Sequence, residues 1–131
     1  MNLSKSVSHG MIAMGYIAKQ PDGRCIPAEE ISKEFDIPDA YLGKVMFRLA
    51  QAGILRSKHG PQGGFSLAKP AKEISLLEII EAVEGPLKSS YGIAEQVKKQ
   101  KIALNMDEIY NKATDQAMAI LKKAKLSDLV K

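Results

Sequence analysis

The sequence is poor in cysteine and tryptophan and has no long apolar run, and each of these absences excludes a class of protein. The single cysteine, Cys25, cannot form an internal disulfide or build a Cys-rich metal centre alone. The lack of tryptophan and the 5% aromatic content argue against a platform that stacks single-stranded bases. No stretch resembles the apolar core of a signal peptide or the ~20 apolar residues of a bilayer span. We therefore expect a cytoplasmic protein without a membrane partner.

Sequence motifs of catalysis are absent as well. The chain has no P-loop, no glycine-rich dinucleotide motif after a strand, no Ser/His/Asp set and no cluster of metal ligands. We therefore expect a protein that is not an enzyme and that holds neither a metal nor a cofactor.

The composition indicates a small folded protein with a mild basic excess. With 131 residues, 45% of them apolar, the chain suits one compact domain, or a small domain with an oligomerisation arm. Its 19 Lys and Arg outnumber its 15 Asp and Glu, which gives a net charge of +4. This excess permits a polyanionic partner without requiring one.

Apolar spacing and turn residues predict a helix-turn-helix in the first part of the chain. A first helix over residues 3–18 ends at Pro21-Asp22-Gly23, and a second, over residues 28–35, starts after Pro27. Cys25-Ile26 is expected to form a brief strand between them. Asp39 is expected to cap a third helix, which Gly53 ends in a left-handed conformation. The expected buried residues of the three helices are Leu3, Val7, Met11, Met14, Ile17, Ile31, Phe35, Leu42, Val45, Met46 and Leu49.

A β-hairpin, or wing, is expected directly after the third helix. Residues 54–58 and 64–68 form its strands around Gly60-Pro61-Gln62-Gly63. Ser75 and Glu78 then have the spacing of a capping box, which opens a fourth helix that ends before Gly85-Pro86.

Strong helical periodicity returns over residues 106–124, about 19 residues or roughly 28 Å of helix. Small alanines in its apolar stripe allow close approach of another helix, so we expect a homodimer; packing back on its own domain is the alternative. A short helix over residues 126–130 closes the chain. The expected fold is mainly α with a small β-hairpin. Its parts are a winged helix-turn-helix domain (1–86), a linker or effector-responsive segment (87–105), and a dimerisation helix with the short terminal helix (106–131).

The helix-turn-helix and wing carry the residues expected to contact double-stranded DNA. The third helix would present polar side chains to the major groove, and the wing would bring cations and a tight glycine turn to a groove beside it. The alternative for the wing charges is simple solvation. The candidate residues are Lys5, Asp39, Tyr41, Lys44, Arg48, Arg56, Lys58, His59 and Gln62.

These segments together resemble the Rrf2 family of bacterial winged-helix transcription regulators over nearly the whole chain. The wing followed by Leu-Ala-Lys-Pro is the most specific part of the resemblance. The matching stretches are Ile26-Pro27, AEEISKEFDIP, YLGKVMFRLAQAGIL, HGPQGGFSLAKP, SLLEIIEAVEGP and LSDLV. The resemblance implies a homodimer, joined by the long helix, that places two winged helices on a palindromic operator.

The sequence departs from the family in two respects. Many members hold an iron–sulfur cluster through three cysteines before the dimer helix, whereas residues 89–105 here contain none, so we expect no conventional cluster. Members often have Glu in the recognition helix where this chain has Gly43, and Arg in the wing where it has His59. These changes imply a different operator.

Cys25 is the one candidate for redox sensitivity. If it is exposed beside Arg24, its thiolate could be oxidised; the alternative, an inert small apolar residue, is favoured.

The resulting hypothesis is a dimeric DNA-binding repressor without an iron–sulfur cluster, controlled by a small-molecule or protein effector that acts near residues 87–106. The alternative is a winged-helix module whose main ligand is a protein rather than DNA.

Overall fold

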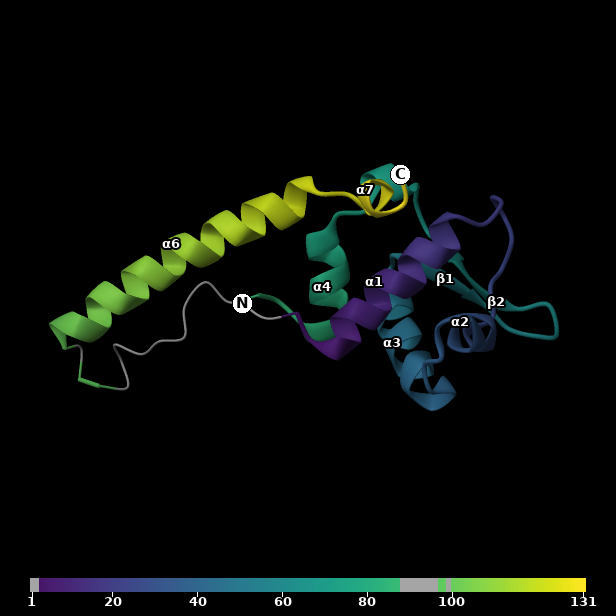
Figure 1. The fold of residues 1–131 in the computed structure, drawn as a ribbon, viewed down its shortest axis with the longest axis horizontal. Helices are drawn as coiled ribbons and strands as arrows, with labels where there is room; N and C mark the ends of the chain where they lie inside the picture. The colour runs from purple at the N-terminus through teal and green to yellow at the C-terminus, as the bar shows by residue number, and fades with distance from the viewer. Residues whose placement is uncertain (1–2, 88–96, 99) are drawn as a thin grey trace.

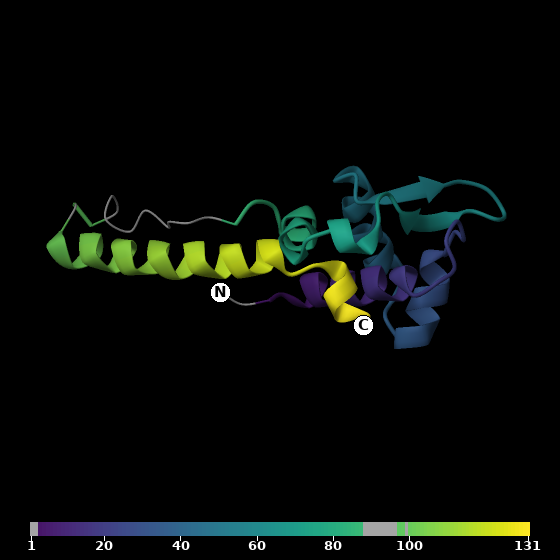
Figure 2. The same ribbon diagram turned by 90° about the horizontal axis from the view of Figure 1, so that it is seen from above.

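The computed structural model describes residues 3–87, 97–98 and 100–131 (Figures 1 and 2). Among these described residues, six helices and two strands precede the last short helix. In chain order they are α1 (Lys5–Ala18), α2 (Ala28–Phe35), α3 (Asp39–Gln51), β1 (Leu55–Lys58), β2 (Gly64–Leu67), the 3-10 helix η1 (Ala71–Glu73), α4 (Leu76–Glu84), α6 (Lys101–Lys123) and α7 (Leu126–Leu129).

Helix α1 is the centre of the core. Its buried face packs on α3, α4 and α7. Gly10 lies where these helices come closest, since a Cβ there would be 3.2 Å from Val83 Cγ2 and 3.4 Å from Val45 Cγ1. The helix begins later than expected, because the Ser4 side chain caps it by accepting from the Val7 amide at 3.1 Å. The prediction of a buried Leu3 was therefore wrong; Leu3 lies outside the helix and is exposed.

Helices α2 and α3 form the expected helix-turn-helix, with two corrections. Asp39 does not cap α3: Pro38 occupies the N-cap position, no side chain caps the helix, and Asp39 is already its first residue. Its carboxylate instead lies in the first turn, where the helix dipole favours negative charge. Phe35 was expected to be buried but is exposed, with its ring edge-on to Tyr16 at 5.8 Å.

The wing is an antiparallel hairpin tied to the domain by an isolated β-bridge. Its register runs from Leu55 opposite Leu67 to Lys58 opposite Gly64. Ile26 pairs with Phe65 through two backbone hydrogen bonds of 2.8 Å, so the brief strand expected at Cys25-Ile26 is present only as a one-residue bridge at Ile26. Strand β2 of the wing is thus fixed, near its turn end, to the segment between α1 and α2.

The capping box at the start of α4 is confirmed, with Ser75 Oγ accepting from the Glu78 amide at 3.0 Å and Glu78 accepting from the Ser75 amide at 2.8 Å. Backbone hydrogen bonds also join the C-terminal end of α6 to the N-terminus of α4. The Leu76 amide donates to Ala124 O at 2.9 Å, and the Leu126 amide donates to Ile74 O at 2.8 Å. Leu126 of α7 is fully buried in the core.

Helix α6 has 23 residues, or about 34 Å, and begins five residues before the predicted start at Met106. It extends away from the domain, toward the end opposite the wing (Figures 1 and 2). The predicted responsive segment falls largely on residues 88–96 and 99, which lie outside the described residues. Among the described residues, no helix is long and apolar enough to cross a membrane.

Candidate nucleic-acid interface

Helix α3 has one buried face and one outer row. Leu42, Val45, Met46 and Leu49 face the core. Ala40, Lys44, Phe47 and Gln51 follow one another at spacings of four, three and four, so they form a single exposed row on the opposite side. We call these four residues the outer row of α3. Helix α3 lies at the same end of the molecule as the wing (Figure 1).

Tyr41, a predicted DNA-contacting residue, is held by α1. Its hydroxyl lies 2.8 Å from Ser6 Oγ, and its ring meets the His9 imidazole edge-on, with centroids 5.4 Å apart. The side chain is half-buried. Tyr41 therefore fixes the start of the recognition helix against α1.

Arg48, also predicted to contact DNA, is directed toward α4. Its Nη1 donates to the Val83 carbonyl at 2.9 Å, in the last turn of α4. This carbonyl has no acceptor role inside α4, because the last carbonyls of a helix lack intrahelical partners. Arg48 therefore couples α3 to α4, and Lys44 is the predicted contact of α3 that lies in its outer row.

The remaining candidate residues are exposed. Arg56, Lys58, His59 and Gln62 lie on the wing, and Lys5 and Asp39 lie in the first turns of α1 and α3. Cys25 is half-buried and lines a cavity of about 420 Å³ under the wing, together with Arg24, Lys58 and Gln62. The structure thus brings most wing candidates together, whereas Tyr41 and Arg48 already have partners within the protein.

A hydrogen-bonded network that the sequence did not indicate supports the turn beside the wing. Glu30 accepts from the Tyr16 hydroxyl at 2.6 Å and from Arg24 Nη2 at 2.5 Å. Arg24 Nη1 also donates to Gln20 at 2.9 Å. The Tyr16 hydroxyl and the Arg24 guanidinium hold the pKa of the Glu30 carboxyl below its usual value. Of these contacts, only the four-residue spacing of Gln20 and Arg24 is a signal visible in the sequence.

Replacing Glu30 with Gln should lower the thermal unfolding midpoint at neutral pH. Because the pKa of Glu30 is lowered in the folded protein, its carboxylate stabilises the fold above the unfolded-state pKa of about 4.3. This stabilisation disappears as the pH falls through the lowered folded-state pKa. The midpoints of the two proteins, measured by circular dichroism, should therefore differ most near neutrality and converge in acid.

Glu29→Gln is the matched control, because Glu29 lies in the same first turn of α2 and is exposed. It removes the same charge without touching Tyr16 or Arg24. An equal loss of stability in both variants would show that helix charge, rather than the network, is responsible.

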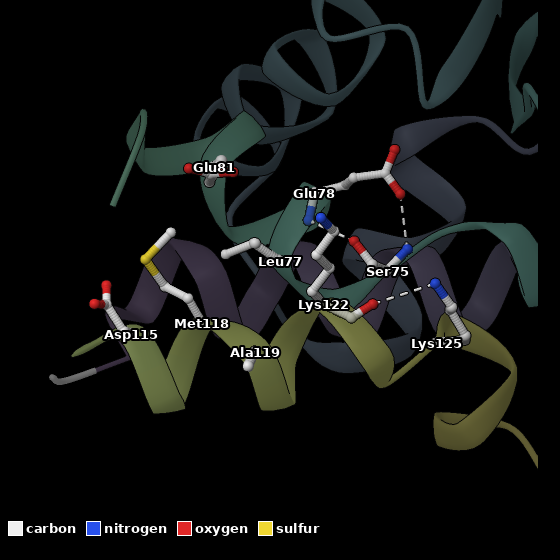
Figure 3. Close-up of a pocket in the computed structure, with 9 residues that line it drawn as sticks. All are labelled: Ser75, Leu77, Glu78, Glu81, Asp115, Met118, Ala119, Lys122 and Lys125. Atoms are coloured by element: carbon white, nitrogen blue, oxygen red, sulfur yellow. Dashed lines mark hydrogen bonds between the residues drawn. The ribbon is translucent and has the colours of Figure 1, made fainter. Parts of the chain in front are cut away.

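The junction of α4 and α6 is a second feature of interest (Figure 3). A cavity of about 560 Å³ lies there, lined by acidic Glu78, Glu81 and Asp115 and by basic Lys122 and Lys125. Burial favours a higher pKa for Glu78, but hydrogen bonds from Lys69, at 2.7 Å, and Ser75 outweigh it and leave the pKa below its usual value. The charged groups therefore surround the point where the long helix joins the domain.

A family model described as Rrf2, iron-dependent transcriptional regulator, matches residues 3–131. The chain belongs to the Rrf2 family. It is 28% identical to the transcriptional regulator IscR of Cereibacter sphaeroides over 136 aligned residues, which cover 100% of this chain and 88% of that protein. The oxidized form of Staphylococcus aureus CymR superposes with a TM-score of 0.76 at 28% identity, over 100% of this chain and 97% of that one.

A third relative is similar over the first part of the chain. A protein of Aquifex aeolicus named as an HTH-type transcriptional regulator is 43% identical over 81 residues. The match covers 62% of this chain and only 56% of that protein. Membership of the Rrf2 family confirms the mainly helical winged-helix fold and makes this protein a transcriptional regulator, which is not an enzyme.

The family description names iron, but the ligands of this chain do not fit an iron–sulfur cluster. Such clusters are held by several cysteine thiolates, and this Rrf2 protein has one cysteine. Within the described ranges, no group of three His, Cys, Asp or Glu residues is placed to hold a metal ion.

Proposed function

We propose that this Rrf2 protein is a repressor that binds a palindromic operator in double-stranded DNA as a homodimer. The recognition helix α3 of each subunit enters a major groove, and each wing follows the flanking minor groove. The observation that supports this most is the common placement of two cationic elements at one end of the molecule. Lys44 lies in the outer row of α3, and Arg56, Lys58 and His59 lie exposed on the wing.

Dimerisation is supported by the exposed apolar side chains of α6. Ile102, Met106, Ile109 and Ile120 are 79%, 50%, 70% and 69% exposed in the single chain. Their spacings of four, three and eleven keep them on one side of the helix, and we call them the apolar row of α6. Burying each isoleucine would contribute about 1.5–3 kcal/mol, so a second copy of the same helix is the partner that fits.

A signal would reach the DNA-binding end through the α4–α6 junction. The two backbone bonds at Ile74 and Leu76 join the end of α6 to the start of α4, and Arg48 joins the end of α4 to α3. A small-molecule or protein effector that shifts α6 would therefore change the spacing of the two recognition helices. Such a regulator acts in the cytoplasm, where bacterial DNA lies.

The function is tested by gel-shift titrations of upstream promoter fragments over a series of salt concentrations. We expect one fragment to bind far more tightly than random duplex, with an affinity that falls as salt rises. If no fragment binds better than random duplex at physiological salt, the specific-regulator proposal fails.

Replacing Lys58 and His59 together with Ala should lower the operator affinity about tenfold and reduce the salt slope by about one. The wing cations lose their phosphate contacts, while the recognition helix is untouched. Lys72→Ala on η1 is the control, because it also removes an exposed lysine but lies outside the wing. Unchanged affinity in the double variant would favour the alternative, a module whose winged helix binds another protein.

A further inference from the structure

Phe47 is an exposed aromatic side chain in the middle of the recognition helix. It is 60% exposed, although its neighbours Met46 and Leu49 are fully buried. A phenylalanine side chain that stays in water forgoes the free energy that its burial would contribute. Its position is central in the outer row of α3, one turn beyond Lys44.

The surroundings of Phe47 make an open apolar surface. Gly43 lies four residues before it, and a Cβ built there would meet nothing within 4 Å. Ala40 lies one further turn away in the outer row and is exposed. On the N-terminal side of Phe47, the surface that α3 presents outward is therefore low, and Lys44 is the one charged member of the outer row.

This chemistry determines which base edge the surface can accept. Base edges in the major groove present hydrogen-bond donors and acceptors, except for the 5-methyl group of thymine, which is apolar. A phenyl ring cannot satisfy a donor or an acceptor, and covering one would cost the free energy of an unmade hydrogen bond. A ring placed over the methyl group buries apolar area on both sides.

We propose that Phe47 contacts the 5-methyl group of a pyrimidine in the operator and so selects thymine at one position of each half-site. The inference rests on the proposed function, since it requires α3 to lie in the major groove. Lys44 and the wing cations at the same end of the molecule favour duplex DNA as the occupant of this face. The inference assigns sequence selection to a side chain without a polar group.

The test replaces thymines by deoxyuridine, one symmetric pair at a time, in an operator selected from random duplexes. Deoxyuridine pairs like thymine but lacks the methyl group. We expect one such pair to lower wild-type affinity about fourfold per half-site, the effect of exposing one methyl group. The Phe47→Ala protein should bind the thymine and deoxyuridine operators equally, and Phe47→Leu should retain part of the difference.

A further duplex separates the methyl group from the base pair that carries it. Replacing the same T·A pair by C·G should weaken binding, and 5-methylcytosine in that C·G pair should restore part of the loss. Phe35→Ala is the control variant, because Phe35 is an exposed aromatic residue of α2 outside the outer row. It should keep the full difference between thymine and deoxyuridine.

The outcomes distinguish a failure of this inference from a failure of the proposed function on which it rests. If the protein selects an operator but no thymine is sensitive to loss of its methyl group, the Phe47 inference is wrong and the regulator proposal stands. The inference is also wrong if a folded Phe47→Ala protein, with an unchanged circular dichroism spectrum, still binds the thymine operator more tightly than the deoxyuridine operator. If no operator is selected and the outer row binds a protein instead, both proposals fail.

Discussion

Replacing Ile109 with Glu on α6 should convert the proposed dimer to a monomer and lower operator affinity by at least about 100-fold. Ile109 is 70% exposed in the single chain and lies in the middle of the apolar row. In a dimer, the new carboxylate would face its symmetry mate in an apolar contact, where burial of charge is costly. Sedimentation equilibrium at micromolar concentration gives the mass, and gel shift gives the affinity.

The loss of affinity follows from linkage rather than from any lost DNA contact. In the proposed dimer, binding of one half-site holds the second winged helix near its own half-site at a millimolar effective concentration. A monomer must bind each half-site independently. The affinity of Ile109→Glu for a single half-site should therefore equal that of the wild-type winged helix on the same short duplex.

Leu104→Glu is the matched control, since it replaces an exposed apolar residue of α6 that lies on the side of the helix away from the apolar row. It should remain dimeric and bind normally. A dimeric Ile109→Glu protein with normal operator binding would exclude the apolar row as the dimer contact.

Features with short-range causes could be predicted from the sequence. The capping box joins Ser75 to a residue three positions away, and the wing turns at glycines inside one hairpin. The spacing of apolar residues predicted the chain positions of α1 to α4, because each of these helices buries one face on the same core. The order of these elements then indicated a helix-turn-helix with a wing.

Helix starts without a local signal were predicted less well. Helix α6 begins at Lys101 without a side-chain cap and with no acidic residue in its first turn. Both features are unusual at a helix N-terminus, so the basic run before Met106 indicated only a solvated turn or a short helix. At α3, a capping residue type was present at Asp39, but Pro38 takes the N-cap position.

The use of polar residues on α3 could not be predicted, because it depends on distant partners. Tyr41 bonds to Ser6 and Arg48 bonds to Val83, each 35 residues away along the chain. Periodicity separates the core face of a helix from the rest but does not show which remaining residues meet another element. Only the three-dimensional packing assigns Tyr41 and Arg48 to the support of α3 and leaves Lys44 and Phe47 in the outer row.

Replacing Gly64 with Ala should lower the free energy of unfolding by about 3 kcal/mol and weaken operator binding at least tenfold. Gly64 has a φ of 147°, and a Cβ there would lie 2.5 Å from the backbone carbon of Ile26 and 2.7 Å from Pro27 N. Because these are backbone atoms, no rotamer change can relieve the clash. Urea unfolding measures the stability, and gel shift measures the affinity.

The clash should act by separating the wing from Ile26. The two hydrogen bonds between Ile26 and Phe65 adjoin Gly64, so their amide protons should lose protection from hydrogen exchange before those of α1 do. Gly60→Ala is the control: Gly60 also has a positive φ, of 103°, in the same hairpin, but a Cβ there meets nothing within 4 Å. The free energy of unfolding of the Gly60→Ala protein should fall only by the cost of backbone strain, about 1 kcal/mol. Its Ile26 and Phe65 amides should stay protected from exchange. Equal effects of the two substitutions would mean that φ alone, and not the contact with Ile26, determines how firmly the wing is held for DNA.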